Sequence, residues 1–271
     1  MNSGLMGKVA VITGGARGQG RSHAVRLAAE GADIVVCDVV DQLPSVRYPM
    51  SRVQDLDETV KLVEQLGRRC IAMVADVRDT TAMRAVAERA MAEYRAIDIV
   101  LANAGIMTMS ENTWELTDEQ WDETLGVNLT GVFKICRAAI PHMIAGRRGG
   151  SIVITSSVAG LRSYPAMGHY TVSKHGVVGL MRNLARELAP HRIRVNTLHP
   201  TGVRTGMAFN SYLGEYLGVR PDLARFMNGN LMGVDAIEPS DVSEAVAWIV
   251  SERARWVTGA TIPVDAGFLM R

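Results

Sequence analysis

The sequence predicts a single α/β domain, doubly wound, in which helices cover both faces of a mostly parallel seven-stranded sheet. Short apolar runs typical of buried strands alternate with longer stretches of helical periodicity along the chain. A glycine-rich segment directly follows the first of these runs. No repeat, low-complexity segment or interdomain linker divides the 271 residues, so residues 1–271 are expected to form one domain with a large core.

Composition narrows the possible functions and locations. The 29 basic and 28 acidic residues leave a formal net charge of +1, which gives no basic field to attract nucleic acid or an anionic membrane. Cys37, Cys70 and Cys136 are far apart and lie in apolar runs, so we expect reduced thiols and neither disulfides nor a metal site. We find no secretion signal and no apolar run of membrane-spanning length. A soluble, cytoplasmic protein is the expectation.

The first strand, Val9–Ile12, leads into a glycine loop, and a helical pattern follows until about Gly31. Strand, glycine loop and helix in this order are typical of the first unit of a Rossmann-type dinucleotide-binding domain. Glycines let the backbone approach a pyrophosphate, whose charge is favoured at a helix N-terminus. A plain tight turn is the alternative, which the flanking strand and helix disfavour. The loop residues expected to contact the cofactor are Gly14, Arg17, Gly18, Gln19 and Gly20.

The second strand, Ile34–Cys37, ends in Asp38, about 20 residues beyond the glycines. A carboxylate at this position accepts hydrogen bonds from the adenosine ribose hydroxyls and repels a 2′-phosphate, which favours NAD over NADP. Arg17 argues the other way, because a guanidinium in the loop is able to reach a phosphate. We give Asp38 the greater weight.

An unusually long connector, residues 39–54, separates Asp38 from a helix at residues 56–66 and contains Pro44 and Pro49. Connections in α/β units usually have about 2–6 residues. The insert is therefore either a decorated surface loop or, as we favour, a lid beside the adenosine end of the cofactor.

The third strand, Ile71–Val74, is followed by Asp76 and Val77, which are placed to meet the adenine ring. A carboxylate after a strand often only caps the next helix, here residues 83–94, although Asp79 is able to fill that role. The fourth strand, residues 97–101, precedes Asn103, Ala104 and Gly105, where the backbone is expected to pass close to the cofactor.

A long helix is predicted from about Asn128 to Ile144, with Asn128 on its first turn. The Asn128 side chain is either a structural polar group or an amide that holds a water for proton relay. The next strand, Ile152–Ile154, runs toward Ser157, whose hydroxyl is then placed at a carboxyl end of the sheet.

Tyr170 and Lys174 are four residues apart, so they share one face of the helix that the apolar pattern at residues 177–184 predicts. An ammonium beside a phenol favours the phenolate, which enables the phenol to act as an acid or base nearer neutral pH. The Tyr-x-x-x-Lys pattern is a weak signal by itself, and the rest of the chain gives it weight.

The sixth strand, Ile193–Leu198, is followed by a segment in which the Val203 amide and the Thr205 hydroxyl are placed to meet a nicotinamide carboxamide. We interpret His199, before a proline, and His169, beside Tyr170, as packed structural groups. Residues 206–237 combine methionines and aromatics with glycines and predict a mobile apolar cap over a substrate. A helix at residues 241–250 and a strand at residues 261–264 complete the sheet.

The combined pattern resembles the short-chain dehydrogenase/reductase family over essentially the whole chain. The resemblance implies that Tyr170 is the general acid/base, that Ser157 orients the alcohol or carbonyl oxygen, and that Asn128 anchors a relay water. Lys174 would bind the nicotinamide ribose and lower the Tyr170 pKa. Two positions depart from the family pattern: Ala102 replaces an asparagine and Thr201 replaces a glycine. The matching positions are Thr13, Gly14, Gly18, Gly20, Asp76, Asn103, Ala104, Gly105, Asn128, Ser157, Tyr170, Lys174 and Pro200.

Within that family, the insert and the Gly-Gly-Ala-Arg-Gly-Gln-Gly and His-Pro-Thr-Gly-Val segments resemble the mycofactocin-associated, carveol-dehydrogenase-like branch. The resemblance implies oxidation of apolar, terpenoid-like secondary alcohols such as carveol. It also implies a tightly bound NAD that an external redox carrier, mycofactocin, re-oxidises in place. A homotetramer is implied as well, built through the long helices after Asn128 and Tyr170, with an apolar helix face at residues 177–180, and through the C-terminal region.

Two other functions are disfavoured by particular residues. An NADPH-dependent carbonyl or acyl-thioester reductase is disfavoured by Asp38 and by the absence of a basic residue at Val39. A non-catalytic dinucleotide sensor on the same fold is disfavoured because Tyr170 and Lys174 are both present.

Overall fold

A computed structural model describes residues 4–227 and 229–271. Its sheet has seven strands, all parallel, in the order β3-β2-β1-β4-β5-β6-β7. Strands β2 and β3 lie on one side of β1, and β4 and the later strands lie on the other side. The switch point of the doubly wound sheet is therefore between β1 and β4. The strands are β1 Val9–Thr13, β2 Asp33–Asp38, β3 Cys70–Val74, β4 Ile99–Ala102, β5 Gly150–Thr155, β6 Ile193–Pro200 and β7 Thr261–Val264.

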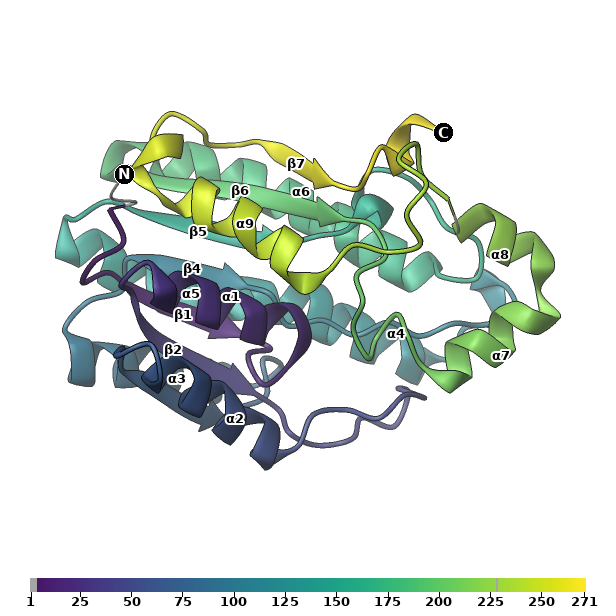
Figure 1. Cartoon of the computed structure of the whole chain (residues 1–271), viewed down its shortest axis with the longest axis horizontal. Coiled ribbons are helices and arrows are strands. Elements are labelled where there is room, and N and C mark those ends of the chain that lie inside the picture. Colours follow the sequence, from purple (N-terminus) through teal and green to yellow (C-terminus); the bar gives the residue numbers. More distant parts are fainter. Residues whose placement is uncertain (1–3, 228) are drawn as a thin grey trace.

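Helices cover both faces of the sheet, as Figure 1 shows. Helices α1 and α9 pack on each other over one face, next to α2, and α3, α5 and α6 cover the other face. The helices are α1 Gly18–Ala29, α2 Val53–Glu64, α3 Thr80–Tyr94, α4 Asp118–Leu125, α5 Val132–Gly146, α6 Gly168–Leu188, α7 Ser211–Val219, α8 Pro221–Met227 and α9 Pro239–Val250.

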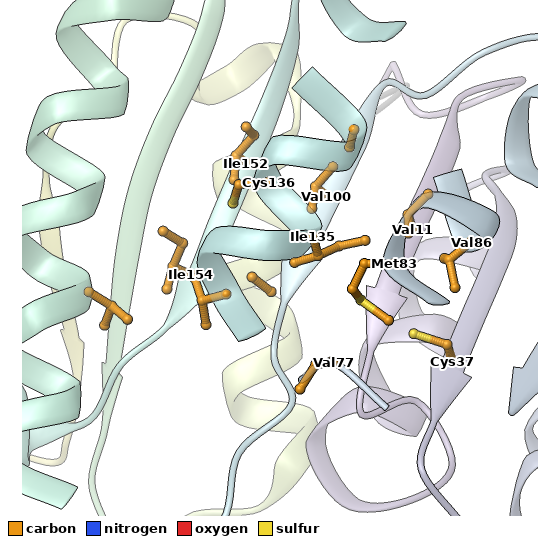
Figure 2. Close-up of a cluster of buried hydrophobic side chains, with 14 of the residues drawn as sticks. Val11, Cys37, Val77, Met83, Val86, Val100, Ile135, Cys136, Ile152 and Ile154 are labelled. Atoms are coloured by element: carbon orange, nitrogen blue, oxygen red, sulfur yellow. The ribbon is translucent and has the colours of Figure 1, made fainter. Parts of the chain in front are cut away.

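Two apolar layers hold the sheet between the helices. Figure 2 shows one of them, in which Met83 of α3 and Ile135 of α5 meet Val11, Val100 and Ile152 of the central strands. Strands covered on both faces must be apolar along their whole length, which is why they appear in the sequence as continuous runs without alternation. The central strands β1 and β4 are buried at every residue.

The predicted strands agree with the observed ones to within two residues at each end, and the single-domain α/β class with a parallel sheet is confirmed. The long helix differs from the prediction. It starts at Asp118 rather than near Asn128, and a π-helical turn, Gly126–Gly131, joins α4 to α5. Asn128 therefore lies in the middle of a continuous helical segment and not on a first turn. Thr117 begins the helix because it forms a capping box with Gln120.

Residues 206–237 contain two helices, α7 and α8, that the sequence analysis did not predict. Asn210 caps α7 by accepting a hydrogen bond from the Leu213 amide. In Figure 1 these helices lie beyond the carboxyl ends of the strands, at the same end of the sheet as the insert between β2 and α2.

The three cysteines are free thiols, and burial raises the pKa of each, to about 12 for Cys70 and Cys136. Among the residues described, no helix is long and apolar enough to cross a membrane.

Candidate active site

The glycine loop packs against the segment after β4. Gly14 has φ +67°, and a Cβ atom on it would lie 2.8 Å from the Ala104 Cα. A Cβ on Gly20 would lie 2.0 Å from the Gly14 carbonyl oxygen, so glycine is required at both positions. Thr13 holds the glycine loop against the segment after β4, because its hydroxyl accepts hydrogen bonds from the amides of Asn103 and Ala104.

Asp38 stands at the end of β2, beside this loop. Its carboxylate accepts hydrogen bonds from the Ala16 amide (3.0 Å), the Val39 amide (2.9 Å) and the Ser51 hydroxyl (2.8 Å). A carboxylate offers about four acceptor positions, so one remains for a ligand hydroxyl. The residue after Asp38 is an apolar valine, which offers a 2′-phosphate no positive charge.

The glycine loop, Asp38 and the segment after β4 enclose a crevice of about 150 Å³ along the switch point of the sheet. Tyr48, Met50 and Leu43 of the insert close its outer side. The predicted cofactor residues that line it are Gly14, Arg17, Gly18, Gln19, Gly20, Asp38, Asp76, Val77, Asn103, Ala104, Gly105 and Thr205.

Four hydrogen bonds tie the insert down over the crevice. The Arg17 guanidinium donates to the Pro49 carbonyl (2.6 Å), and the Ser51 hydroxyl donates to Asp38. The Ser45 amide donates to Glu123 of α4 (3.0 Å). At the far end, the Tyr48 hydroxyl accepts from the Met107 amide (3.3 Å). The insert thus covers more than the adenosine end, since Met107 also lines a second, neighbouring cavity.

The Asp76 carboxylate contacts a neighbouring arginine of the same chain. It accepts from the Arg78 amide (2.8 Å) and forms an ion pair with the Arg78 guanidinium (2.7 Å). Arg78 also pairs with Glu123 (3.1 Å), so Asp76 is linked through Arg78 and Glu123 to the insert. Asp79, in contrast, is the N-cap of α3, as the sequence analysis allowed.

Ser157, Tyr170 and Lys174 come together at the carboxyl ends of β5 and β6. The Ser157 side chain follows β5 and lines the same cavity as Tyr170 of α6. Burial raises the Tyr170 pKa, and the Ser157 side chain opposes that rise. The Lys174 Nζ lies 5.5 Å from the Tyr170 ring centroid and donates to the Thr155 carbonyl (2.8 Å).

Lys174 is almost fully buried, and burial lowers its pKa to about 8. Lys174 was expected to lower the Tyr170 pKa, but burial of the phenol raises that pKa instead. Desolvation favours the neutral forms of both groups, and a further positive charge at the phenol would be needed to stabilise the phenolate.

Asn128 is wholly buried and its side chain is used by the protein itself. The amide oxygen accepts from the Ile106 amide (2.8 Å), and the amide nitrogen donates to the Ile106 carbonyl (2.8 Å) and to Ser173 (3.3 Å). This arrangement corresponds to the structural alternative for its side chain. A Cβ on Gly105 would lie 3.3 Å from the Asn128 Oδ1 and 3.5 Å from the Lys174 Nζ, so both side chains stand directly behind the crevice wall.

His199 and His169 are fully buried and hydrogen-bonded. The His199 Nδ1 is 2.7 Å from the Ser157 carbonyl and its Nε2 is 2.8 Å from the Thr197 hydroxyl. The His169 Nε2 is 2.5 Å from the Thr108 hydroxyl. Both are packed groups, and His199 additionally holds the backbone of Ser157.

A second cavity, the substrate cleft, adjoins the crevice and has a volume of about 920 Å³. Ser157, Tyr170, Pro200 and Val203 line it on the side of the sheet. Its other walls are mainly apolar and come from α7, from the end of α8 and from the C-terminal turn, with Leu213, Leu217, Met227 and Phe268.

An aromatic cluster holds helix α8 against the cleft. The Tyr164 ring stacks on Phe268 with 6.2 Å between the ring centroids, and Phe226 meets Tyr164 edge-on at 5.5 Å. The Arg162 guanidinium lies over the Phe226 ring, 4.4 Å from its centroid. These contacts join the loop after β5, helix α8 and the chain end around one cleft.

The residues at the carboxyl ends of the strands fit a dinucleotide. The glycine loop leaves no room for side chains at its closest approach, Asp38 keeps an acceptor for a ribose hydroxyl, and the crevice opens at Gln19, Thr205 and Met207 into the cleft that holds Tyr170. Tyr48, Met107 and Glu123 were not anticipated as parts of the site. Only the length of the insert hinted at Tyr48, and nothing in the sequence pairs it with Met107.

A protein-family profile described as enoyl-(acyl carrier protein) reductase matches residues 14–269. The chain therefore belongs to this family of short-chain dehydrogenases/reductases.

Close relatives cover the whole fold. The (-)-trans-carveol dehydrogenase of Rhodococcus erythropolis is 48% identical over 274 residues, which make up 98% of this chain and 98% of that protein. The crystal structure of carveol dehydrogenase from Mycobacterium avium in complex with NAD has a TM-score of 0.93 at 43% identity, over 98% of this chain and 99% of that one. A short chain dehydrogenase from Mycobacterium paratuberculosis bound to NAD has a TM-score of 0.94 at 42% identity, with the same coverage.

Proposed function

We propose that the protein is an NAD-dependent dehydrogenase that oxidises apolar secondary alcohols to ketones. The observation that carries the proposal is the placement of Ser157 and Tyr170 in one apolar cleft, with Lys174 beside Tyr170, where that cleft adjoins a dinucleotide crevice. Homologues named carveol dehydrogenase, one of them in complex with NAD, support it.

The chain divides the binding of NAD among five segments. Asp38 takes the ribose of the adenosine half, while Asp76 and Val77 flank the adenine. The loop from Gly14 to Gly20 receives the pyrophosphate at the N-terminus of α1. At the other end, Pro200, Val203 and Thr205 meet the nicotinamide, and Lys174 binds its ribose. When bound, NAD supplies the hydride acceptor and places a positively charged ring near the phenol.

The proton is handled by the protein. Ser157 donates a hydrogen bond to the substrate oxygen and orients it toward Tyr170. Tyr170, as phenolate, takes the hydroxyl proton, and a positive charge beside it favours that form. Lys174 stands one helical turn away, and Asn128 holds the backbone at Ile106 behind the crevice wall. The Asn128 amide oxygen keeps one further acceptor position beside its bond to Ile106, and a relay water bound there would return the proton to solvent.

The insert, residues 39–54, acts as a lid that retains NAD between turnovers. Its hydrogen bonds to Arg17, Asp38, Glu123 and Met107 support this role. An NAD held in this way is re-oxidised in place by an external redox carrier of the mycofactocin type.

Residues 206–237 form the substrate cap, with terpenoid alcohols such as carveol as the substrate class. The apolar walls and the cleft volume of about 920 Å³ suit such molecules, since pockets for drug-sized ligands measure about 300–1,000 Å³.

We also propose a cytoplasmic homotetramer, with a corrected contact surface. Val177 and Val178, which the sequence analysis assigned to a helix face between subunits, are buried in the core of the chain itself. The large apolar side chains exposed on the two long helices are Phe133 of α5 and Val172 of α6. These two residues and the C-terminal region are the surfaces that a partner subunit would cover.

Tyr170→Phe tests the activity. The change removes only the hydroxyl, so turnover of a secondary alcohol should fall by about 100- to 10,000-fold, the range for general acid–base catalysis. NAD binding should stay nearly intact. The control is Tyr164→Phe, because this buried tyrosine lines the same cleft and should keep its activity. Retained turnover in Tyr170→Phe rejects the proposed acid/base.

Comparing the affinities of the stripped protein for NAD and NADP tests the cofactor choice. Asp38 predicts tighter binding of NAD by an order of magnitude or more, because it repels the 2′-phosphate. Equal affinities, or a preference for NADP, would favour the carbonyl reductase alternative.

A further inference from the structure

Gln19 lies at the junction of the crevice and the substrate cleft. It lies in the first turn of α1 and is one of three residues, with Thr205 and Met207, that line both the crevice and the substrate cleft. The junction of the two cavities is where a dinucleotide anchored at Asp38 must bring its reactive ring to reach Tyr170. Gln19 is therefore beside the reactive end of the proposed cofactor.

The Gln19 side chain is unpaired within the part of the chain that the structure describes. Its amide oxygen is inaccessible to solvent and has no hydrogen-bond partner there. Burying an amide oxygen without a partner is unfavourable, and such groups in proteins call for an explanation. A glutamine carries one acceptor and two donors, so it suits a ligand group with the same capacities.

The carboxamide at the nicotinamide end of NAD has that chemistry, since it too both accepts and donates. Thr205, a predicted carboxamide contact, is adjacent: a Cβ on Gly18 would lie 3.2 Å from the Thr205 Cγ2. The pyrophosphate offers only acceptors, and the backbone amides of the glycine loop are available for it.

We propose that the Gln19 side-chain amide pairs with the carboxamide of the nicotinamide ring. The pair fixes the rotation of the ring about its bond to the ribose, and so decides which face of the ring turns toward the cleft. Gln19 is thus a positioning residue for hydride transfer, in an inference that rests on the proposed NAD-dependent function.

Gln19→Met tests the pairing, because methionine keeps the unbranched length and removes the amide. The dissociation constants of NAD and ADP-ribose are measured by calorimetry on charcoal-treated protein. ADP-ribose contains the adenosine, pyrophosphate and second ribose of NAD but lacks the nicotinamide. We expect about tenfold weaker binding of NAD, as the loss of one or two neutral hydrogen bonds predicts, and unchanged binding of ADP-ribose.

The matched control is Gln65→Met at the exposed end of α2, which should leave both affinities unchanged. Unchanged NAD binding by Gln19→Met overturns the inference. An equal loss for NAD and ADP-ribose also overturns it, because it assigns Gln19 to the pyrophosphate. If Gln19→Met does not fold, Gln19→Asn is used with the same expectation, since the shorter amide does not reach the ring. Failure of the wild-type protein to bind NAD would instead reject the proposed function.

Discussion

Ser157 is held by its backbone as well as by its side chain. Its hydroxyl accepts a hydrogen bond from the Ala159 amide (3.1 Å), and its carbonyl lies 2.7 Å from the His199 Nδ1. Burial lowers the His199 pKa to about 4, so the ring is neutral at physiological pH. A neutral ring whose Nδ1–H donates to Ser157 leaves Nε2 to accept from Thr197, and both nitrogens are then satisfied. His199 thereby positions the hydroxyl that orients the substrate.

Replacement of His199 should therefore change catalysis more than cofactor binding. His199→Leu removes the donor to the Ser157 carbonyl, and kcat should fall about tenfold, the equivalent of one hydrogen bond of about 1.4 kcal/mol. His199→Asn keeps an N–H near the Nδ1 position and should recover most of the loss. The measurements are kcat for a secondary alcohol and the Kd of NAD, which should stay constant. Equal defects in the two variants would show that His199 only fills space.

At the level of elements, the insert is the feature that sets this chain apart from a bare doubly wound domain. The insert has no regular secondary structure between β2 and α2, yet its own side chains Leu43, Val46 and Tyr48 are buried. The crevice under it, about 150 Å³, is below the range of about 300–1,000 Å³ for drug-sized ligands. We therefore expect the insert to move outward when a dinucleotide enters or leaves. Val40 at its start has φ +48°, a strained conformation for a β-branched residue.

Weakening the attachment of the insert should speed the exchange of NAD. Glu123→Ala removes the acceptor of the Ser45 amide and one partner of Arg78, while Asp76 keeps its own bonds to Arg78. We expect NAD to dissociate several-fold faster, because the insert opens more often. The protein is loaded with NADH, which the same lid should retain, and its release is followed by NADH fluorescence after mixing with excess NAD. Glu119→Ala, on the exposed face of the same helix, is the control. Equal release rates in both variants would contradict the lid.

The elements differ in how well the sequence predicts them. The strands and the position of the insert were predictable, because continuous apolar runs and an overlong connector are local signals. The contact of Tyr48 with Met107 was not, since it joins two loops that only the fold brings together. Asn128 was misplaced because a π-turn has no distinctive composition. Helices α7 and α8 were missed because their apolar residues face a cleft as well as the protein, and this obscures helical periodicity.

Across the whole molecule, three buried histidines remain neutral. Burial lowers the pKa of His23 to about 3 and those of His169 and His199 to about 4. They lie in different regions: His23 is on α1 and bonds to Ser243 of α9, whereas the other two stand near the candidate active site. The exposed fraction of each side chain is at most 1%. None of them is able to accept a proton without disturbing the packing on its side of the sheet.

This arrangement predicts a steep loss of stability in mild acid. The unfolded chain protonates these histidines below about pH 6.5, while the folded chain does not until about pH 4, so stability falls as the pH drops through that window. Each histidine should contribute about 2 kcal/mol between pH 7 and pH 5, a large loss against a typical total of about 5–15 kcal/mol. The free energy of unfolding is measured in urea at both pH values and one protein concentration. His23→Leu should remove about a third of the difference, because Ser243 keeps its bonds to Ser22 and Pro239. The exposed His191→Gln should leave it unchanged. An unaltered difference in His23→Leu would assign the acid sensitivity to other groups.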